Sequence, residues 1–165
     1  MKVGEFDGIT VFVDEPYDEE DYFNEFNKKE ILEYTSLEFP LDTSNLSKKK
    51  IYREKDEKRF IFKKSGKIVG SSDLYSIKKD HKATIRFWVA EDFQGQGIAT
   101  NALKIILEYA FDKLNLVRVD AYVFKKNIGS QRTLEKLGFE NEGLLKKFDR
   151  KGGEYIDEYI YSKIK

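Results

Sequence analysis

One stretch of the sequence, residues 84–107, most constrains how this chain folds. Residues 84–89 are mainly apolar and aromatic, as in a strand with one buried face. From residue 98 onward, Ala, Leu and Ile recur at helical spacing as far as Phe111. Gln94-Gly95-Gln96-Gly97 stands between the two, and its glycines allow a sharp turn and a close approach to a ligand. The stretch therefore predicts a strand, a tight turn and a helix.

The start of that helix is a predicted anion site. Its first N–H groups have no partner within the helix, and the positive end of the helix dipole points at the turn. A phosphate or pyrophosphate suits such a site. Two common nucleotide motifs do not fit: the Gly-Lys-Ser/Thr ending of a phosphate loop is absent, and Thr100 stands where the dinucleotide fingerprint has a third Gly or Ala. A turn with a purely structural role is the alternative.

Two motifs in succession resemble the GNAT superfamily of N-acetyltransferases. Gln94, Gly97 and Ala99 form Gln-x-x-Gly-x-Ala after a strand ending at Val89, which resembles that family's acetyl-CoA signature. Residues 127–139 resemble its Asn-x-x-Ser/Ala helix, which ends in Leu-Gly-Phe. The resemblance covers about residues 59–161 and is closest to the branch of ribosomal-protein N-terminal acetyltransferases, the RimJ/RimL type.

The resemblance implies acetyl-CoA as the acetyl donor, and no metal. It places the pantetheine arm against the backbone of Phe87–Val89, in a gap between two splayed strands, where Asn127 would hydrogen-bond it. The pyrophosphate would lie on the N–H groups of the glycine turn. The Val89 N–H would donate to the reacting carbonyl oxygen. Ser130 is a candidate donor to the departing thiolate through a water, with a structural hydroxyl in the first turn of its helix as the alternative. The implied cofactor-binding residues are Phe87, Trp88, Val89, Gln94, Gly95, Gln96, Gly97, Ile98, Ala99, Thr100, Asn127 and Ser130.

Two departures from the family pattern concern the general acid and the general base. Leu134 stands where many relatives carry a tyrosine acid, and Thr84 stands where several carry a glutamate base. Asp120 and Asp157 are the remaining candidates for the base, and each has an alternative role as a hydrogen-bond anchor. The chain has no cysteine, which favours direct transfer without an acyl-enzyme. The candidate catalytic residues are Val89, Asp120, Tyr122, Ser130 and Asp157.

Patterns of alternation and turn residues predict the remaining elements. Strands are expected at 9–13, 59–64, 67–75, 82–89, 117–124, 142–149 and 154–162, and helices at 14–33, 28–37, 97–113 and 129–137. Several α/β (α+β) folds would accommodate this order. The resemblance selects the GNAT fold, a mixed and mostly antiparallel sheet flanked by helices, whose fourth and fifth strands splay. We expect one domain over residues 1–165, with acceptor-side helices at about 14–39 and an acetyl-CoA-binding core at about 59–162.

Charge and hydropathy exclude several other function classes. Thirty basic and thirty acidic residues cancel, so there is no general case for binding nucleic acid or an anionic membrane. No segment approaches the ~20 apolar residues of a membrane span, and the N-terminus does not resemble a signal peptide, so we expect a cytoplasmic protein. Residues 14–33 are acidic and residues 48–82 are basic. Both runs are read as solvated surface, with attraction of a cationic substrate to the acidic run as the functional alternative.

The acceptor of the acetyl group is predicted to be a primary amine. An alkyl amine with a pKa near ~10.4 needs a competent base, whereas a peptide α-amine with a pKa of ~7.7–8.0 needs far less help. Because Thr84 and Leu134 replace the usual base and acid, the sequence favours a protein or peptide N-terminal α-amine. A small polycationic amine, such as a polyamine or an aminoglycoside, is the alternative, and a non-catalytic acyl-CoA-binding module is a further one. A homodimer is left open.

Overall fold

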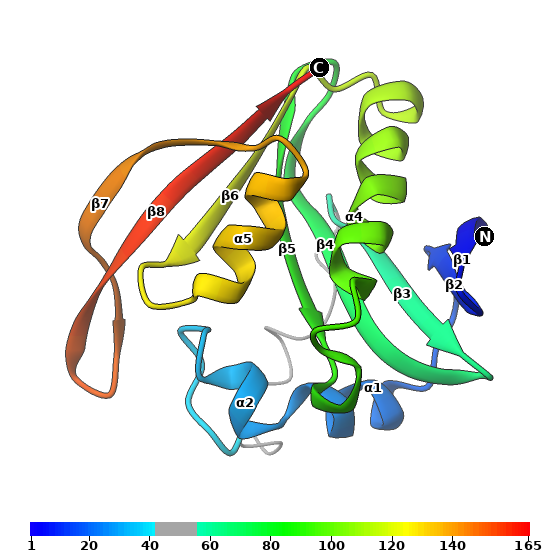
Figure 1. Cartoon of the computed structure of the whole chain (residues 1–165), viewed down its shortest axis with the longest axis horizontal. Coiled ribbons are helices and arrows are strands. Elements are labelled where there is room, and N and C mark those ends of the chain that lie inside the picture. Colours follow the sequence, from blue (N-terminus) through cyan, green and yellow to red (C-terminus); the bar gives the residue numbers. More distant parts are fainter. Residues whose placement is uncertain (42–55) are drawn as a thin grey trace.

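The computed structural model describes residues 1–41 and 56–165, so residues 48–55 of the basic run lie outside the described residues. In this part of the chain, eight strands form one sheet in the order β1-β2-β3-β4-β5-β6-β8-β7 (Figure 1). The strands are β1 Lys2–Phe6, β2 Ile9–Val13, β3 Lys58–Lys64, β4 Lys67–Lys78, β5 Lys82–Val89, β6 Arg118–Phe124, β7 Glu140–Lys151 and β8 Glu154–Ile164. The helices are α1 Glu19–Phe26, α2 Lys29–Leu32, α4 Ile98–Glu108 and α5 Ile128–Lys136, with a 3-10 turn η1 at Glu91–Phe93 and a π-helical turn η2 at Tyr109–Lys113.

The parallel pair β5–β6 is the feature of the sheet that matters most for function. Its registered pairs run only from Lys82 with Arg118 to Thr84 with Asp120, while every other neighbouring pair is antiparallel. Beyond Thr84 the two strands diverge, as Figure 1 shows. The mixed, mostly antiparallel sheet and its splay are as predicted.

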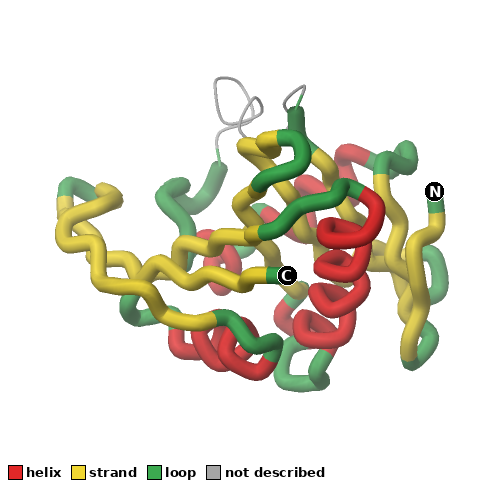
Figure 2. Tube along the Cα trace, turned by 90° about the horizontal axis from the view of Figure 1, so that it is seen from above, coloured by secondary structure: helices red, strands yellow, loops and turns green. Residues whose placement is uncertain are grey.

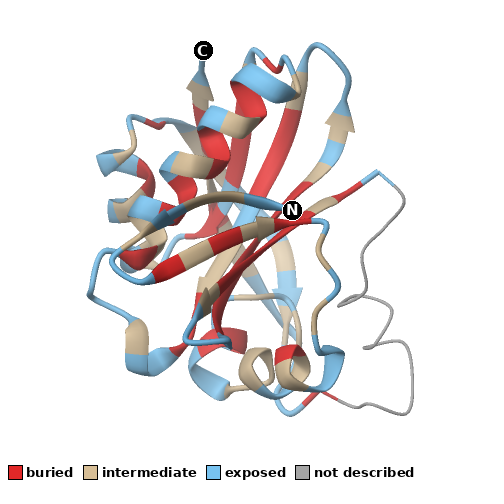
Figure 3. Cartoon of the chain, turned by 90° about the vertical axis from the view of Figure 1, so that its right-hand side faces the viewer, coloured by how far each residue is buried: buried red, intermediate tan, exposed pale blue. Residues whose placement is uncertain are grey.

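The two faces of the sheet are covered by different helices. β5 illustrates the division, because Ala83, Ile85 and Val89 join the larger core with α4 and α5, while Trp88 packs on the other face with α1 and α2. This alternation follows from the two-residue period of a strand. Figure 3 shows the buried residues gathered along the strands behind α4. The hairpin of β7 and β8 extends beyond the body of the molecule (Figures 1 and 2).

The N-terminal region differs most from the sequence prediction. β1 is a strand that the sequence analysis leaves out, and it pairs with β2 through Asp7-Gly8, both with positive φ, which is a hairpin signature. The predicted helix over 14–33 is shorter, because the Asp18 side chain caps α1 by accepting from the N–H groups of Glu20 and Asp21. Asn27 then ends α1. No helix in the described residues is long and apolar enough to cross a membrane.

Candidate active site

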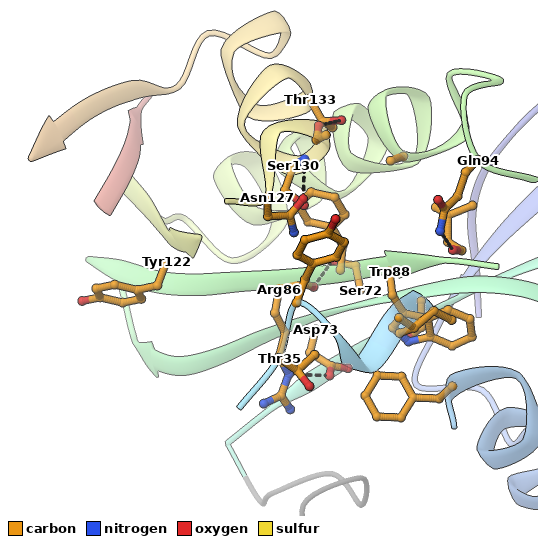
Figure 4. Close-up of a pocket in the computed structure, with 18 of the residues that line it drawn as sticks. Thr35, Ser72, Asp73, Arg86, Trp88, Gln94, Tyr122, Asn127, Ser130 and Thr133 are labelled. Atoms are coloured by element: carbon orange, nitrogen blue, oxygen red, sulfur yellow. Dashed lines mark hydrogen bonds and ion pairs between the residues drawn. The ribbon is translucent and has the colours of Figure 1, made fainter. Parts of the chain in front are cut away.

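A cavity of about 1060 Å³ opens where β5 and β6 part. Its walls come from the ends of these strands, the turn before α4, the first turns of α5, and residues 30–37 around α2. In Figure 4, Asn127 and Ser130 lie on one side of the cavity and Arg86 and Asp73 on the other. Gln94 and Tyr122 lie at opposite ends. We call the end near Gln94 the turn end and the end near Tyr122 the acidic end.

The turn end is built by the glycine-rich segment that the sequence singled out. Gly97 is the N-cap of α4 with φ 77°, and no side chain caps that helix, so its first-turn N–H groups are open to an anionic ligand. A Cβ built on Gly95, with φ 72°, meets no atom within 4 Å, so the space beside the turn is open. The Gln94 amide fixes the turn by donating to the Val89 carbonyl at 3.0 Å.

The Val89 N–H points into the gap between β5 and β6. The next amide, that of Ala90, donates to the Val69 carbonyl on β4 at 2.9 Å. Because successive N–H groups along a strand point to opposite sides, the Val89 N–H points away from β4. Val89 itself lines the cavity. This backbone donor therefore faces the space between the two strands.

The start of α5 forms the wall above the gap. Asn127 caps the helix by accepting from the Ser130 N–H at 3.1 Å, which leaves its amide nitrogen as a donor towards the cavity. Ser130 also lines the cavity. Leu134, one turn further on, is fully buried in the core, so the position of the family's tyrosine faces away from the cavity.

The cavity collects most of the predicted site residues but not all of them. Its lining includes Phe87, Trp88, Val89, Gln94, Gly95, Gly97, Ile98, Ala99, Thr100, Tyr122, Asn127 and Ser130. Gln96 is not in the lining, and its side chain donates to the Asp92 carbonyl instead. The two aspartates proposed as bases, Asp120 and Asp157, are also outside it.

Asp120 is a buried anchor between strands. Its carboxylate accepts from Lys82 Nζ at 3.0 Å and from Arg118 Nε at 2.5 Å. It lies at the last registered pair of β5 and β6, opposite Thr84. Two cationic partners surround it where the parallel pairing ends, so the anchor role weighed in the sequence analysis fits the geometry better than the role of a base.

Asp157 supports an irregularity in the neighbouring strand. The pairing of β7 with β8 shifts between Leu145 and Asp149, and the Asp157 carboxylate accepts from the Lys147 N–H at 2.9 Å within this bulge. Lys147 has φ 53°, a conformation that is uncommon away from glycine. Because neighbouring residues of a strand face opposite ways, Glu158 and not Asp157 faces the cavity.

Glu158 and Asp149 form a carboxylate pair at the acidic end. Burial, together with the charge and hydrogen bond of Asp149, raises the pKa of Glu158 to about 7. Neither residue forms an ion pair with a cationic side chain within the described parts of the chain. The sequence analysis missed both residues, because a slip of one position in β8 exchanges the two faces.

The other buried acids near this end are paired with arginines. Asp73 accepts from Arg59 at 2.7 and 3.1 Å and from Arg86 at 2.9 Å, and Arg86 also donates to Glu57. Within the described residues, two guanidinium groups face two carboxylates in this network, so their formal charges cancel. The pair formed by Glu158 and Asp149 therefore dominates the local electrostatics, which makes the acidic end attractive to a cation.

Aromatic side chains complete the acidic end. Tyr122 stacks on Phe148 with ring centroids 5.3 Å apart and planes 15° apart, and both rings line the cavity. Tyr75 also lines it and interacts electrostatically with Arg86 and Glu158. Among the acidic residues of the run at 14–33, only Glu30 lines the cavity. The negative charge comes from β7 and β8 instead.

Comparisons with known proteins agree with this geometry. The family model described as an acetyltransferase (GNAT) domain matches residues 12–140. The chain is similar to the Bacillus subtilis protein named uncharacterized N-acetyltransferase YnaD, with 32% identity over 149 residues, covering 80% of this chain and 84% of that protein.

Two solved structures illustrate the likeness of the fold. The ribosomal-protein-S5-alanine acetyltransferase from Vibrio fischeri has a TM-score of 0.80 and 22% identity, covering 99% of this chain and 96% of that one. The spermidine N-acetyltransferase from Vibrio cholerae, in complex with CoA and spermine, has a TM-score of 0.82 and 24% identity, covering 95% of each chain.

Proposed function

Because the chain belongs to the GNAT acetyltransferase family and is thus an N-acetyltransferase, we propose that it transfers acetyl from acetyl-CoA directly to a cationic primary amine. The observation that carries this proposal is that two features share one cavity. The first is the uncapped start of α4 beside the parted strands β5 and β6. The second is the carboxylate pair of Glu158 and Asp149, which no cationic side chain of the described residues neutralises. The first feature suits a pyrophosphate and the second suits an ammonium group.

The turn end of the cavity fits the donor. Open N–H groups of the first turn of α4 would hold the pyrophosphate, and Gly95 and Gly97 leave room for it. Arg132 and Lys136 on α5 also line the cavity and add positive charge. The backbone of Phe87–Val89 and the amide of Asn127 face the gap in which a pantetheine arm would lie. Acetyl-CoA, once bound there, supplies the acetyl group as a thioester.

The catalytic roles follow from what lines the gap. The Val89 N–H would donate to the carbonyl oxygen as negative charge develops on it, which is the kind of fixed donor that lowers such barriers. The amine nitrogen forms the new bond to the acetyl carbon as the carbon–sulfur bond breaks. A thiol with a pKa near ~8.5 leaves readily as thiolate, and the Ser130 hydroxyl would protonate it through a water.

Glu158 is the proposed general base, with Asp149 as its partner. A base works best when its pKa lies near the operating pH, and the pKa of Glu158 is raised to about 7. Its carboxylate would take the proton that the ammonium group must lose before it attacks. Asp120 and Asp157, the bases proposed from sequence, have structural roles instead. Asp120 accepts from Lys82 and so links β6 to β5, and Asp157 stabilises the bulge in β7.

The acidic end favours a small polycationic amine as the acceptor. The sequence argument for a peptide α-amine assumes that a competent base is missing, and Glu158 removes that assumption. The uncompensated carboxylate pair and the stacked rings of Tyr122 and Phe148 suit an alkylammonium group. A peptide N-terminus remains the second candidate, because the fold matches the Vibrio fischeri ribosomal-protein acetyltransferase as well as the spermidine enzyme.

A thiol-release assay tests the proposed activity. Acetyl-CoA is mixed with the protein and with spermidine, a short peptide with a free N-terminus, or no acceptor. We expect CoA release that depends on the amine, an acetylated amine as product, and an unmodified protein mass during turnover. Accumulation of a covalently acetylated protein would exclude direct transfer, and acetyl-CoA binding without CoA release with any amine would favour a non-catalytic acyl-CoA-binding module.

A further inference from the structure

The tip of the hairpin formed by β7 and β8 contacts residues 29–38, which comprise α2 and the residues that follow it. We call these residues the α2 segment. Lys151, the last residue of β7, donates from Nζ to the carbonyl oxygens of Leu32 at 2.5 Å and Thr35 at 3.0 Å. The neighbouring Gly152 N–H donates to the Glu38 carboxylate at 2.7 Å. Lys151 and Leu32 are 119 positions apart in the sequence, so these bonds join two distant parts of the chain.

The α2 segment depends on tertiary contacts to keep its conformation. α2 has only four residues, and helices of this length are not stable by themselves. On one side, the buried Leu32 and Ile31 fix it to the molecule, Leu32 in a cluster with Tyr22 and Ile61. On the other side stands the Lys151 ammonium, beside the Leu32 carbonyl at the C-terminal end of α2, which also accepts from the Thr35 N–H, and beside the Thr35 carbonyl.

Lys151 forms no ion pair with a carboxylate in the parts of the chain that the structure describes, so the two backbone carbonyls are its principal partners. Burial lowers its pKa, which indicates that the ammonium has given up solvent for these bonds. Hydrogen bonds from a charged donor are about twice as strong as neutral ones. The contact is therefore a strong local link between the hairpin and the α2 segment.

Both linked segments line the acidic end of the cavity. The α2 segment contributes Ile31 and residues 34–37, and β7 contributes Phe148 and Asp149. Asp149 is two residues before Lys151 and lies on the same face of β7, beside Glu158. A displacement of the hairpin tip would therefore change the distance between the α2 segment and the carboxylate pair of Glu158 and Asp149.

We propose that Lys151 is a positioning residue, which holds the α2 segment against the β7–β8 hairpin and thereby sets the affinity for the acceptor amine. The consequence for the acceptor rests on the proposed function, whereas the link itself does not. The donor contacts at the turn before α4 and at Asn127 belong to other elements. Loss of the link is therefore expected to affect acceptor binding and to leave acetyl-CoA binding unchanged.

Lys151→Met removes the donors and keeps the length of the side chain. We expect the KM for spermidine to rise about tenfold, while the KM for acetyl-CoA stays within twofold. Lys151→Arg, which can still donate to two carbonyls, should restore the KM for spermidine to within about threefold of the wild type. Lys146→Met is the matched control, because Lys146 is an exposed residue of the same strand. An unchanged KM for spermidine, or equal rises for both substrates, would overturn the proposal.

Amide hydrogen exchange tests the link without requiring turnover. The N–H groups of Leu32, Glu33 and Thr35 donate within the segment and should exchange slowly in the wild type. Lys151→Met should speed exchange over residues 31–37 at least tenfold and leave residues 98–108 unchanged. Unaltered exchange over 31–37 would refute the link even if the protein proved inactive. Faster exchange in a protein that releases no thiol with any amine would keep the link and refute only the proposed function.

Discussion

Glu158 and Asp157 are neighbours in the sequence that point to opposite faces of β8, which makes them a matched pair for mutagenesis. We expect Glu158→Gln to lower kcat by about 10²-fold or more, the scale that a positioned acid–base group contributes. Asp157→Asn, which keeps an oxygen for the Lys147 N–H, should lower kcat far less. Steady-state kinetics with saturating acetyl-CoA would measure both. Equal losses in the two variants would contradict the role given to Glu158.

The raised pKa of Glu158 also predicts a pH dependence. A base must be deprotonated, so the ratio of kcat/KM in the wild type to that in Glu158→Gln should rise with pH around a midpoint near 7. Taking the ratio cancels the ionisation of the amine itself.

The same raised pKa predicts that the free energy of unfolding falls as pH rises. Because the folded state holds this proton more tightly than the unfolded state, the wild type loses stability as pH rises from the ordinary glutamate pKa to about 7. Glu158→Gln should not show that loss in thermal unfolding.

Gly97 combines two requirements that substitutions can separate. Its φ of 77° disfavours any side chain with a Cβ, so Gly97→Ala and Gly97→Asp should both lose roughly 1 kcal/mol of stability. Only the aspartate adds negative charge where the pyrophosphate is proposed to lie. Calorimetric titration should therefore show CoA affinity at least about tenfold lower, ~1.4 kcal/mol, in Gly97→Asp than in Gly97→Ala. Equal affinities would mean that the anion lies elsewhere.

At the scale of elements, the bulge in β7 places Asp149 beside Glu158. The Asp157 carboxylate supports it by accepting from the Lys147 N–H, so Asp157→Ala should lower the free energy of unfolding by about 1 kcal/mol. For a domain of this size the melting temperature would fall by roughly 2–4 °C. Thermal unfolding measures this, with Asp157→Asn as the control that keeps the acceptor oxygen. A fall in kcat as large as that of Glu158→Gln, with an unchanged melting temperature, would argue for a direct catalytic role.

The elements differ in how far the sequence predicts them. β5, the turn and α4 follow from an apolar strand, two glycines and helical spacing, and the structure has all three at those residues. The splay of β5 from β6 came from the family resemblance, because no local pattern encodes where pairing ends. β1 was missed, although Asp7-Gly8 carries a hairpin signal, because Lys2–Phe6 is short and lacks a clear alternation.

The acidic end of the cavity was the least predictable part. Which carboxylates line this end depends on which face of β8 points into the cavity, and a shift of one residue reverses that face. The bulge between Leu145 and Asp149 depends on a long-range contact with Asp157, so the sequence of β7 alone does not reveal it. Asp120 was a candidate base from the sequence, but it is paired with Arg118, two positions away on the same strand, and with Lys82 on β5. Only the assembled sheet brings Lys82 to this carboxylate.

Across the whole molecule, the proposed donor and acceptor sites lie on opposite faces of the sheet. α4 and α5 cover one face and provide the turn end, while α1 and α2 cover the other and border the acidic end. In the described residues, the cavity lies where β5 and β6 part and is lined from both faces there. Acceptor preference can therefore change through α2, β7 and β8 without altering the donor site.

The last prediction concerns which amine this arrangement prefers. We expect kcat/KM for spermidine to exceed that for a monoamine of similar length, and for a short peptide with a free N-terminus, by tenfold or more. The reason is that Glu158 and Asp149 lack a cationic partner in the described residues and attract charge over the distance that salt does not screen, ~10 Å at 0.1 M. The advantage of spermidine should shrink as salt is raised, and it should also shrink in Asp149→Asn. A blocked peptide serves as the negative control. If the free peptide were the better substrate by tenfold, the electrostatics of the acidic end would not decide acceptor choice, and the α-amine hypothesis from the sequence would stand.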